Sequence, residues 1–211
     1  MAEYSSVVRP KNQSGRREQL VAAAREVLLE RGAIGLRVKD VAERAGLSPS
    51  SVLYYYPDTG GLLLEVARGA MERYAADRAA AVRSAEGAVA RLRLAITLGV
   101  PTGPDDEESR VLYEIDALTG SSPAFEVLSA AFFDRQVHLY ESLIQAGAAA
   151  GELAPVADPE TIARGLVALE DGLGLQVVIG HAGLDRDAAE RILLAYAGAM
   201  TGADLGAATP A

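Results

Sequence analysis

The sequence lacks cysteine and tryptophan, and it holds only two histidines and 5% aromatic residues. Without cysteine the chain can form no disulfide, no thiolate nucleophile and no cysteine-based metal site. The two histidines, His138 and His181, lie far apart, and their spacing builds no local metal site. We therefore expect neither a metal nor a cofactor.

The short motifs of the common enzyme classes are also missing. There is no G-x-S-x-G, no P-loop, no dinucleotide-binding glycine motif and no H-E-x-x-H. Glu170 and Asp171 are adjacent, but on a helix they point about 100° apart, which makes them a poor acid–base pair. We expect a protein that is not an enzyme, with a helical enzyme acting on small molecules as a remote alternative.

Long hydrophobic runs are absent as well. The sequence has no apolar N-terminal h-region and no uncharged stretch of about 18 residues, so it predicts neither a signal peptide nor a membrane span. We expect a cytoplasmic protein with no membrane partner. Alanine, leucine, arginine and glutamate dominate the 211 residues, which favours an all-α protein.

Residues 36–62, LRVKDVAERAGLSPSSVLYYYPDTGGL, have the pattern of two short helices joined by a tight turn. The first helix has apolar residues at the spacing of one buried face, namely Val38, Val41, Ala42 and Ala45. Gly46 suits the left-handed residue that ends a helix. Ser48 and Pro49 suit the N-cap and first position of the next helix, which Pro57 ends. This arrangement predicts a helix-turn-helix.

The second of these helices has one face free to bind. The helical period places Val52, Leu53 and Tyr56 against the core. The opposite face then carries small hydroxyls and phenols, namely Ser50, Ser51, Tyr54 and Tyr55. Such side chains reach phosphates and base edges in a major groove without bringing negative charge. The alternative is an ordinary exposed polar face.

The net charge of −9 is unevenly distributed along the chain. Residues 1–56 contain nine basic and six acidic side chains, a balance of +3, whereas the remaining 155 residues carry −12. A basic N-terminal part on an acidic body directs DNA to one end of the molecule. The asymmetry supports DNA binding.

The rest of the chain is predicted to be helical. A helix is expected to begin after Gly60-Gly61, and one long helix is expected over about 75–99 with a possible break near Gly87. The loop of residues 100–109 is expected to lead into the acidic first turn of a further helix that includes Val111 and Ile115. Further helices are expected over 123–150, over 158–180, and from a capping-box-like start at Asp187 and Glu190. In the 123–150 helix, Gln136 is a polar residue within an apolar arc, while His138 lies on the opposite, solvent side.

The helix over 158–180 is apolar nearly all round, so both of its sides must be buried. In a body this small, a second copy of the chain best covers the outer side, which predicts a homodimer. The predicted interface comprises Arg164, Val167, Ala168, Asp171, Leu175, Val178, Ile179, Ile192, Tyr196 and Ala199.

The segment ERGAIGLRVKDVAERAGLSPSSVLYYYPDTGGLLLEV, residues 30–66, resembles the tetracycline-repressor (TetR) family of one-component transcriptional regulators. The resemblance is close over about 15–75 and extends further only in the helical layout. Three positions depart from the family pattern. Arg37 replaces a threonine that caps and contacts phosphate, Leu53 replaces a tyrosine, and Thr59 replaces a phosphate-binding lysine.

The resemblance implies an N-terminal three-helix helix-turn-helix head joined to a C-terminal helical ligand-binding and dimerisation body. It divides the chain into a flexible arm (1–14), a DNA-binding domain (15–61), a body (62–202) and a disordered tail (203–211). It also implies contacts with a double-stranded DNA operator from Arg16, Arg17, Arg37, Lys39, Ser48, Pro49, Ser50, Ser51, Tyr54, Tyr55 and Thr59.

The function that the resemblance implies is repression that a small-molecule effector relieves at a palindromic operator. The middle helices would supply the pocket, and the candidate residues are Leu94, Leu112, Tyr113, Phe125, Phe132, Gln136, Tyr140, Leu169, Glu170 and Leu173. Any of these residues could instead be plain core. The alternative function, which Leu53 and Thr59 leave open, is a helical protein-interaction dimer without specific DNA binding.

Overall fold

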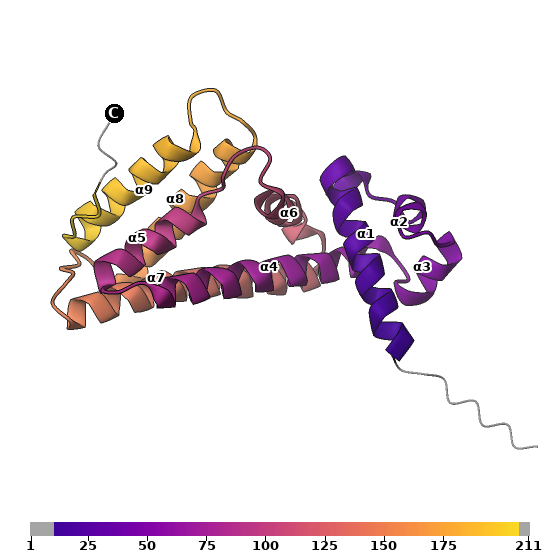
Figure 1. Cartoon of the computed structure of the whole chain (residues 1–211), viewed down its shortest axis with the longest axis horizontal. Helices are drawn as coiled ribbons and strands as arrows, with labels where there is room; N and C mark the ends of the chain where they lie inside the picture. The colour runs from indigo at the N-terminus through magenta and orange to yellow at the C-terminus, as the bar shows by residue number, and fades with distance from the viewer. Residues whose placement is uncertain (1–10, 207–211) are drawn as a thin grey trace, which may run out of the picture. The chain divides into compact units, whose positions relative to one another are not determined.

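The computed structural model describes residues 11–206, and within that range every regular element is a helix. The predicted all-α fold is confirmed (Figure 1). The helices are α1 (Lys11–Gly35), α2 (Val38–Arg44), α3 (Pro49–Tyr55), α4 (Thr59–Ser84), α5 (Ala88–Gly99), α6 (Glu107–Asp116), the 3₁₀ turn η1 (Thr119–Ser121), α7 (Pro123–Ala149), α8 (Pro159–Val178) and α9 (Arg186–Thr201).

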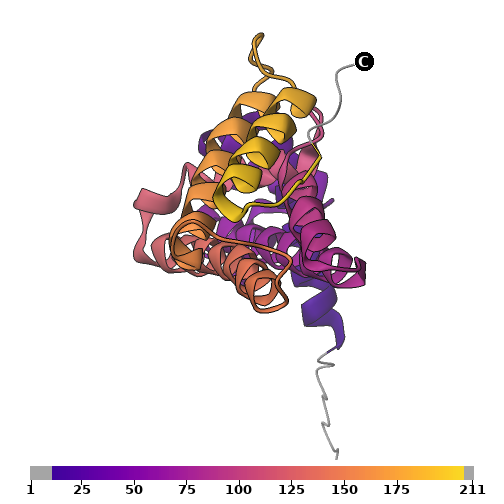
Figure 2. The ribbon, with the colours of Figure 1, turned by 90° about the vertical axis from the view of Figure 1, so that its left-hand side faces the viewer.

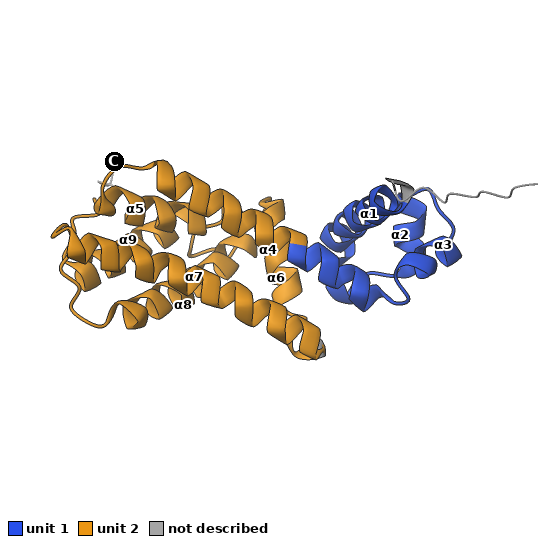
Figure 3. Cartoon of the chain, turned by 90° about the horizontal axis from the view of Figure 1, so that it is seen from below, with its two compact units in different colours: residues 1–68 blue, residues 69–211 orange. Residues whose placement is uncertain are grey.

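The chain forms two compact units, residues 1–68 and residues 69–211, coloured separately in Figure 3. The division falls inside α4 rather than before it. Most of the predicted flexible arm lies outside the described residues, but 11–14 already belong to α1. Of the predicted disordered tail, 203–206 follow α9 without helical structure and the remainder lies outside the described range.

The first unit is a three-helix head completed by the start of α4. Its buried side chains include Leu20, Leu28, Val41, Val52, Tyr56, Leu62 and Val66. Gly32, with φ of 71°, breaks the helical geometry of α1. Gly46, with φ of 65°, makes the turn between α2 and α3, because glycine adopts this conformation without steric cost.

Hydrogen bonds and ion pairs between α1 and α2 lie at the surface of the first unit. The Gln19 amide donates to the carbonyl of Ala45 at 2.8 Å, where α2 ends. Arg44 of α2 pairs with Glu26 at 2.7 Å and with Glu30 at 2.5 Å, both on α1. These ion pairs are exposed and screened by water, so each contributes little to stability.

The second unit is built around α5, which packs against α7, α8 and α9. The core side chains include Leu92, Ile96, Tyr140, Ile144, Leu166 and Leu193, all fully buried. Helices α8 and α9 run side by side, as the orange and yellow ribbons of Figures 1 and 2 show. Among the described residues, no helix has the length and apolar character needed to cross a bilayer.

Two of the predicted helix starts, those of α4 and α9, differ from the structure. The break near Gly87 is present, with φ of 82° at that residue. Helix α4 nevertheless runs without interruption from Thr59, so Gly60 and Gly61 lie in its first turn, where Asp58 accepts from the Gly61 N–H at 2.8 Å. Helix α9 is capped by Asp185 and not by Asp187, because the Asp185 carboxylate accepts from the Ala188 N–H at 2.8 Å.

Asp158 caps the start of α8, where its carboxylate accepts from the Thr161 N–H at 3.1 Å. Substitutions at Asp158 test this cap. Asp158→Ala is expected to lower the free energy of unfolding by about 1 kcal/mol, because a helix N–H loses its acceptor. Asp158→Asn keeps an acceptor oxygen, so it is expected to cost less than half as much. Urea unfolding followed by circular dichroism measures both, and equal losses would contradict the capping role.

Candidate functional site

Helix α3 of the first unit presents its hydroxyl-bearing face outward. The Ser48 hydroxyl caps the helix, accepting from the Ser51 N–H at 3.2 Å, and lies 2.9 Å from the Ser50 hydroxyl. Tyr54 is 76% exposed, and its ring meets that of half-buried Tyr55 edge-on, with centroids 5.1 Å apart. Polar groups at this face are therefore available to a ligand.

Leu53 does not pack in the core as predicted. It is 44% exposed, whereas Val52 and Tyr56 are buried. Two inward residues one turn apart are enough to anchor a helix of seven residues, and Leu53 lies about 100° from Val52, beside the outward face. Its side chain adds an apolar contact surface next to Tyr54, of the kind that suits a thymine methyl.

Basic side chains lie on α1 and at the start of α2 in the same unit. Arg37, at the N-cap of α2, and Lys39 are exposed. On α1, Arg16 bonds to Gln19 at 2.6 Å, and the Arg17 guanidinium lies over the Tyr56 ring, 5.2 Å from its centroid. Of the other predicted contacts, Pro49 is exposed at the first position of α3, and Thr59 is half-buried at the start of α4.

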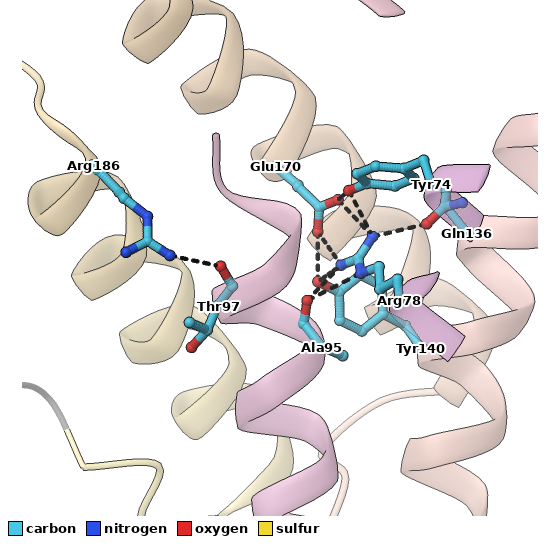
Figure 4. Close-up of polar contacts among 8 residues, drawn as sticks. All are labelled: Tyr74, Arg78, Ala95, Thr97, Gln136, Tyr140, Glu170 and Arg186. Atoms are coloured by element: carbon cyan, nitrogen blue, oxygen red, sulfur yellow. Dashed lines mark hydrogen bonds and ion pairs between the residues drawn. The ribbon is translucent and has the colours of Figure 1, made fainter. Parts of the chain in front are cut away.

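A buried ion pair lies in the centre of the second unit (Figure 4). Arg78 of α4 contacts Glu170 of α8 through two nitrogens, with Nη2–Oε2 at 2.6 Å and Nη1–Oε1 at 2.8 Å. The Arg78 side chain is 1% exposed and that of Glu170 is 7% exposed. Two such charges can be buried only where each is paired and hydrogen-bonded.

The remaining donors of Arg78 are also satisfied. Its guanidinium donates to the Ala95 carbonyl of α5 at 2.7 Å and to the Gln136 side chain of α7 at 2.7 Å. It also donates to the Tyr140 hydroxyl at 2.6 Å, and that hydroxyl in turn donates to Glu170 at 2.5 Å. Burial raises the pKa of the Tyr140 phenol well above its ordinary value, so the hydroxyl stays protonated and can donate.

Gly99 of α5 allows the ion pair to sit this close to the helix backbone. A Cβ at Gly99 would collide with the Glu170 carboxylate and with Nη2 of Arg78. The residue is therefore required for close approach of side chains, not for an unusual backbone conformation.

A small cavity of about 70 Å³, partly open to solvent, borders this ion pair. Its lining residues are Met71, Tyr74, Gly99, Pro101, Ser109, Leu112, Tyr113, Asp116, Phe132, Phe133, Gln136, Glu170 and Asp171. The charged residues of the lining are all acidic, and aromatic rings cover much of the rest. Tyr74 and Phe132 meet at an angle of 60°, with centroids 5.8 Å apart.

The structure brings together half of the predicted pocket residues, namely Leu112, Tyr113, Phe132, Gln136 and Glu170. The other five do not line the cavity. Tyr140 is fully buried behind it, Phe125 is buried, and Leu94, Leu169 and Leu173 are half-buried, the last two against the core. Helical periodicity identified the apolar arc of α7 but not which part of the arc borders a void.

Several residues of the cavity lining and of the ion pair beside it could not be identified from the sequence. Tyr74 and Arg78 are one turn apart in an alanine-rich helix, where an arginine usually lies on the surface. Asp171, predicted at the subunit interface, lines the cavity instead. No pattern in the sequence distinguished these positions, because their environment comes from helices α5, α6 and α7.

Helices α8 and α9 leave an apolar face exposed. Leu175, Ile179 and Ile192, which belong to the predicted interface, are 44%, 65% and 43% exposed. Val167 is instead buried in its own core, and half-buried Tyr196 packs against Gly165, where a Cβ would collide with the phenol oxygen. The remaining predicted residues are exposed (Arg164, Ala168, Ala199) or half-buried (Val178).

Two family models match the chain. The model for bacterial regulatory proteins of the tetR family matches residues 20–66, and the model for the C-terminal part of BetI-type transcriptional repressors matches residues 88–202. Together they cover the head and most of the body.

Curated relatives agree with these matches. The chain is 26% identical to the HTH-type transcriptional regulator RutR of Escherichia coli K12 over 150 residues, which are 70% of this chain and 68% of the relative. It is 25% identical to the HTH-type transcriptional regulator BetI of Rhizobium meliloti over 186 residues, 87% of this chain and 88% of the relative.

Solved structures share the fold. A transcriptional regulator from Saccharomonospora viridis in complex with choline superposes with a TM-score of 0.82 at 25% identity, covering 89% of this chain and 98% of that one. A TetR-family regulator from Rhodococcus sp. gives a TM-score of 0.76 at 27% identity, with coverages of 88% and 98%.

The ion pair can be tested by a double-mutant cycle. Arg78→Met is expected to lower the free energy of unfolding by about 3–5 kcal/mol, because it leaves Glu170 buried without its partner. The double variant Arg78→Met/Glu170→Met is expected to cost less than the two single changes added. Urea unfolding measures all three variants.

The matched control is the exposed pair on α8, in which Arg164 bonds to Glu160 at 2.7 Å. Arg164→Met is expected to lower the free energy of unfolding much less than Arg78→Met, because solvent screens this pair. If Arg78→Met costs no more than Arg164→Met, or if the cycle is additive, the buried pair does not have the assigned role.

Proposed function

Since the chain belongs to the TetR family of DNA-binding transcriptional regulators, we propose that it is a repressor that a small organic cation releases from a pseudo-palindromic operator. The DNA-binding part of the proposal rests on the outward face of α3, where Tyr54 is 76% exposed and Ser48 and Ser50 are also exposed. A helix with such a face, next to exposed basic residues, suits a major groove.

The contacts divide into two kinds in this proposal. Base edges are read from α3 by Ser50, Ser51, Tyr54 and Tyr55, with Ser48 and Pro49 at its N-terminus. Phosphates are held by basic side chains outside α3, namely Arg16, Arg17, Arg37 and Lys39, with Thr59 as a weaker hydroxyl contact. Phosphate contacts give affinity that falls with salt, whereas base contacts give sequence preference.

The cationic nature of the effector is supported by the cavity lining. Quaternary ammonium groups bind over aromatic faces, and Tyr74, Tyr113 and Phe132 supply such faces beside acidic side chains. The Saccharomonospora viridis regulator holds choline in the same fold. We therefore propose choline or a closely similar cation as the effector class.

Helix α4 provides the route from effector to DNA in this proposal. Its residue Tyr74 lines the cavity and its residue Arg78 pairs with the lining residue Glu170, while Leu62 and Val66 of the same helix lie in the core of residues 1–68. A ligand shifts the equilibrium between two states only through its different affinity for them. We propose that the ligand-bound state holds α4 in a position that no longer fits the operator.

The functional unit is proposed to be a homodimer formed through α8 and α9. TetR-family regulators act as dimers, and Leu175, Ile179 and Ile192 leave an exposed apolar face on these two helices. Two copies related by a twofold axis place two α3 helices on half-sites about 34 Å apart, one turn of DNA.

A footprint on the DNA that flanks the protein's own gene tests the DNA-binding proposal. The wild-type protein is expected to protect a pseudo-palindrome with an affinity that falls steeply with salt, because phosphate contacts release counterions. Tyr54→Ala is expected to weaken this binding at least about tenfold while leaving the melting temperature unchanged, because an exposed base contact is lost. A matched Tyr54→Phe variant separates the ring from its hydroxyl.

If no site on this DNA is protected, or if the affinity for DNA does not depend on salt, the proposal is contradicted and a protein-interaction dimer is favoured. A large loss of stability in Tyr54→Ala would show instead that this residue belongs to the core.

Leu175→Glu tests the dimer. Placing a carboxylate in an apolar contact between two copies costs several kcal/mol, so monomers are expected in sedimentation equilibrium. The control is Val127→Glu, which adds the same charge at a 71% exposed apolar position on α7, away from the proposed contact, and is expected to remain dimeric. A dimeric Leu175→Glu variant would move the subunit contact to another surface.

A further inference from the structure

The three carboxylates that line the cavity differ in how their charge is balanced. The Glu170 charge is already cancelled by Arg78, and both of its oxygens accept hydrogen bonds, at 2.6 Å and 2.8 Å from the guanidinium. Tyr140 donates to Glu170 at 2.5 Å, and Tyr74 donates at 3.3 Å. Glu170 thus has neither spare charge nor spare acceptor capacity for a ligand.

Asp171 is in the opposite situation. The Tyr113 hydroxyl donates to its backbone carbonyl at 3.2 Å, but no group within residues 11–206 donates to its carboxylate. The side chain is half-buried and borders the cavity. Asp116, the third carboxylate, is exposed at the rim, where water screens its charge.

We propose that Asp171 is the counter-ion that selects a cation in this cavity, and that cation binding drives the release of a proton from its carboxyl group. The proposal rests on the function proposed above, because it assigns the charge recognition of that same site. No covalent step is involved: the carboxyl group loses its proton to solvent, and the ligand cation takes the place of that positive charge.

The surroundings of Asp171 explain why it holds a proton in the empty cavity. Burial, with repulsion from Glu170 and Asp116, raises its pKa to about 7, and Arg78 opposes the shift. The other titratable groups at the cavity are the phenols of Tyr74 on α4 and Tyr113 on α6, and burial raises the pKa of both. Helix α7 contributes only the uncharged Phe132, Phe133 and Gln136.

The sign of the pH dependence follows from this arrangement. Below about pH 7 Asp171 is protonated, and a cation must displace the proton, so observed affinity falls about tenfold for each further pH unit. Above about pH 7 the carboxylate is already free, and affinity no longer depends on pH. The affinity of a neutral ligand of the same shape is expected not to depend on pH in this way, because such a ligand does not replace the proton's charge.

Calorimetric titration with choline, from about pH 5.5 to about pH 8.5, tests the proposal. For the wild type we expect the pH profile just described, with nearly one proton released per choline at about pH 6, measured in two buffers of different ionisation enthalpy. The neutral isostere of choline, in which a tert-butyl group replaces the trimethylammonium, is expected to bind without pH dependence.

Three variants make the assignment specific. Asp171→Asn is expected to bind choline at least about tenfold more weakly above pH 7, with a flat pH profile, whereas Asp171→Glu restores the dependence. Asp116→Asn is the matched control and is expected to keep the profile with its midpoint moved to lower pH, because a repelling charge has been removed. Thermal melts establish that each variant is folded.

A wild-type profile that survives unchanged in Asp171→Asn overturns the proposal while leaving the cationic effector intact. Failure of the wild type to bind choline at any pH overturns both the effector class and the assignment of Asp171. The footprint on operator DNA is independent of these titrations, so it shows separately whether the repressor function stands.

Discussion

The buried ion pair between Arg78 and Glu170 is the interaction on which the body of this protein depends. Removing two charges from water is costly, and that cost is offset only by complete pairing and hydrogen bonding. One guanidinium meets this requirement by joining α4 to Ala95 on α5, to Gln136 and Tyr140 on α7 and to Glu170 on α8. The side chain of Arg78 thus links four helices, α4, α5, α7 and α8. Gly99 is needed because a Cβ at that position would collide with the ion pair.

The same ion pair defines the chemistry of the cavity beside it. Because Arg78 neutralises Glu170, that part of the lining carries no net charge, and the carboxyl groups without a basic partner in the lining are those of Asp171 and of Asp116 at the rim. The aromatic rings complete a site suited to a compact cation. Arg78 lies on α4, the helix that also supplies Leu62 and Val66 to the core of residues 1–68, so the buried ion pair and the head share one helix.

Part of the fold and of the candidate site could be predicted from the sequence, because some features depend only on residues close together in the chain. The helix-turn-helix follows from Gly46 and Ser48-Pro49, which specify a turn and a capped helix start irrespective of distant contacts. The buried place of Gln136 follows from helical periodicity. Periodicity does not state which neighbouring helix faces a residue, so Arg78 and Asp171 could not be placed. It also assigned Leu53 to the core, because a short helix needs fewer inward residues than its apolar arc offers.

A crystal structure of the choline complex tests the central claim most directly. The account predicts the ammonium group within about 6 Å of the ring centroids of the cavity and beside the Asp171 carboxylate. It also predicts that Arg78 and Glu170 remain paired as they are without ligand. An ammonium group bound to Glu170, with Arg78 displaced from it, would contradict the account.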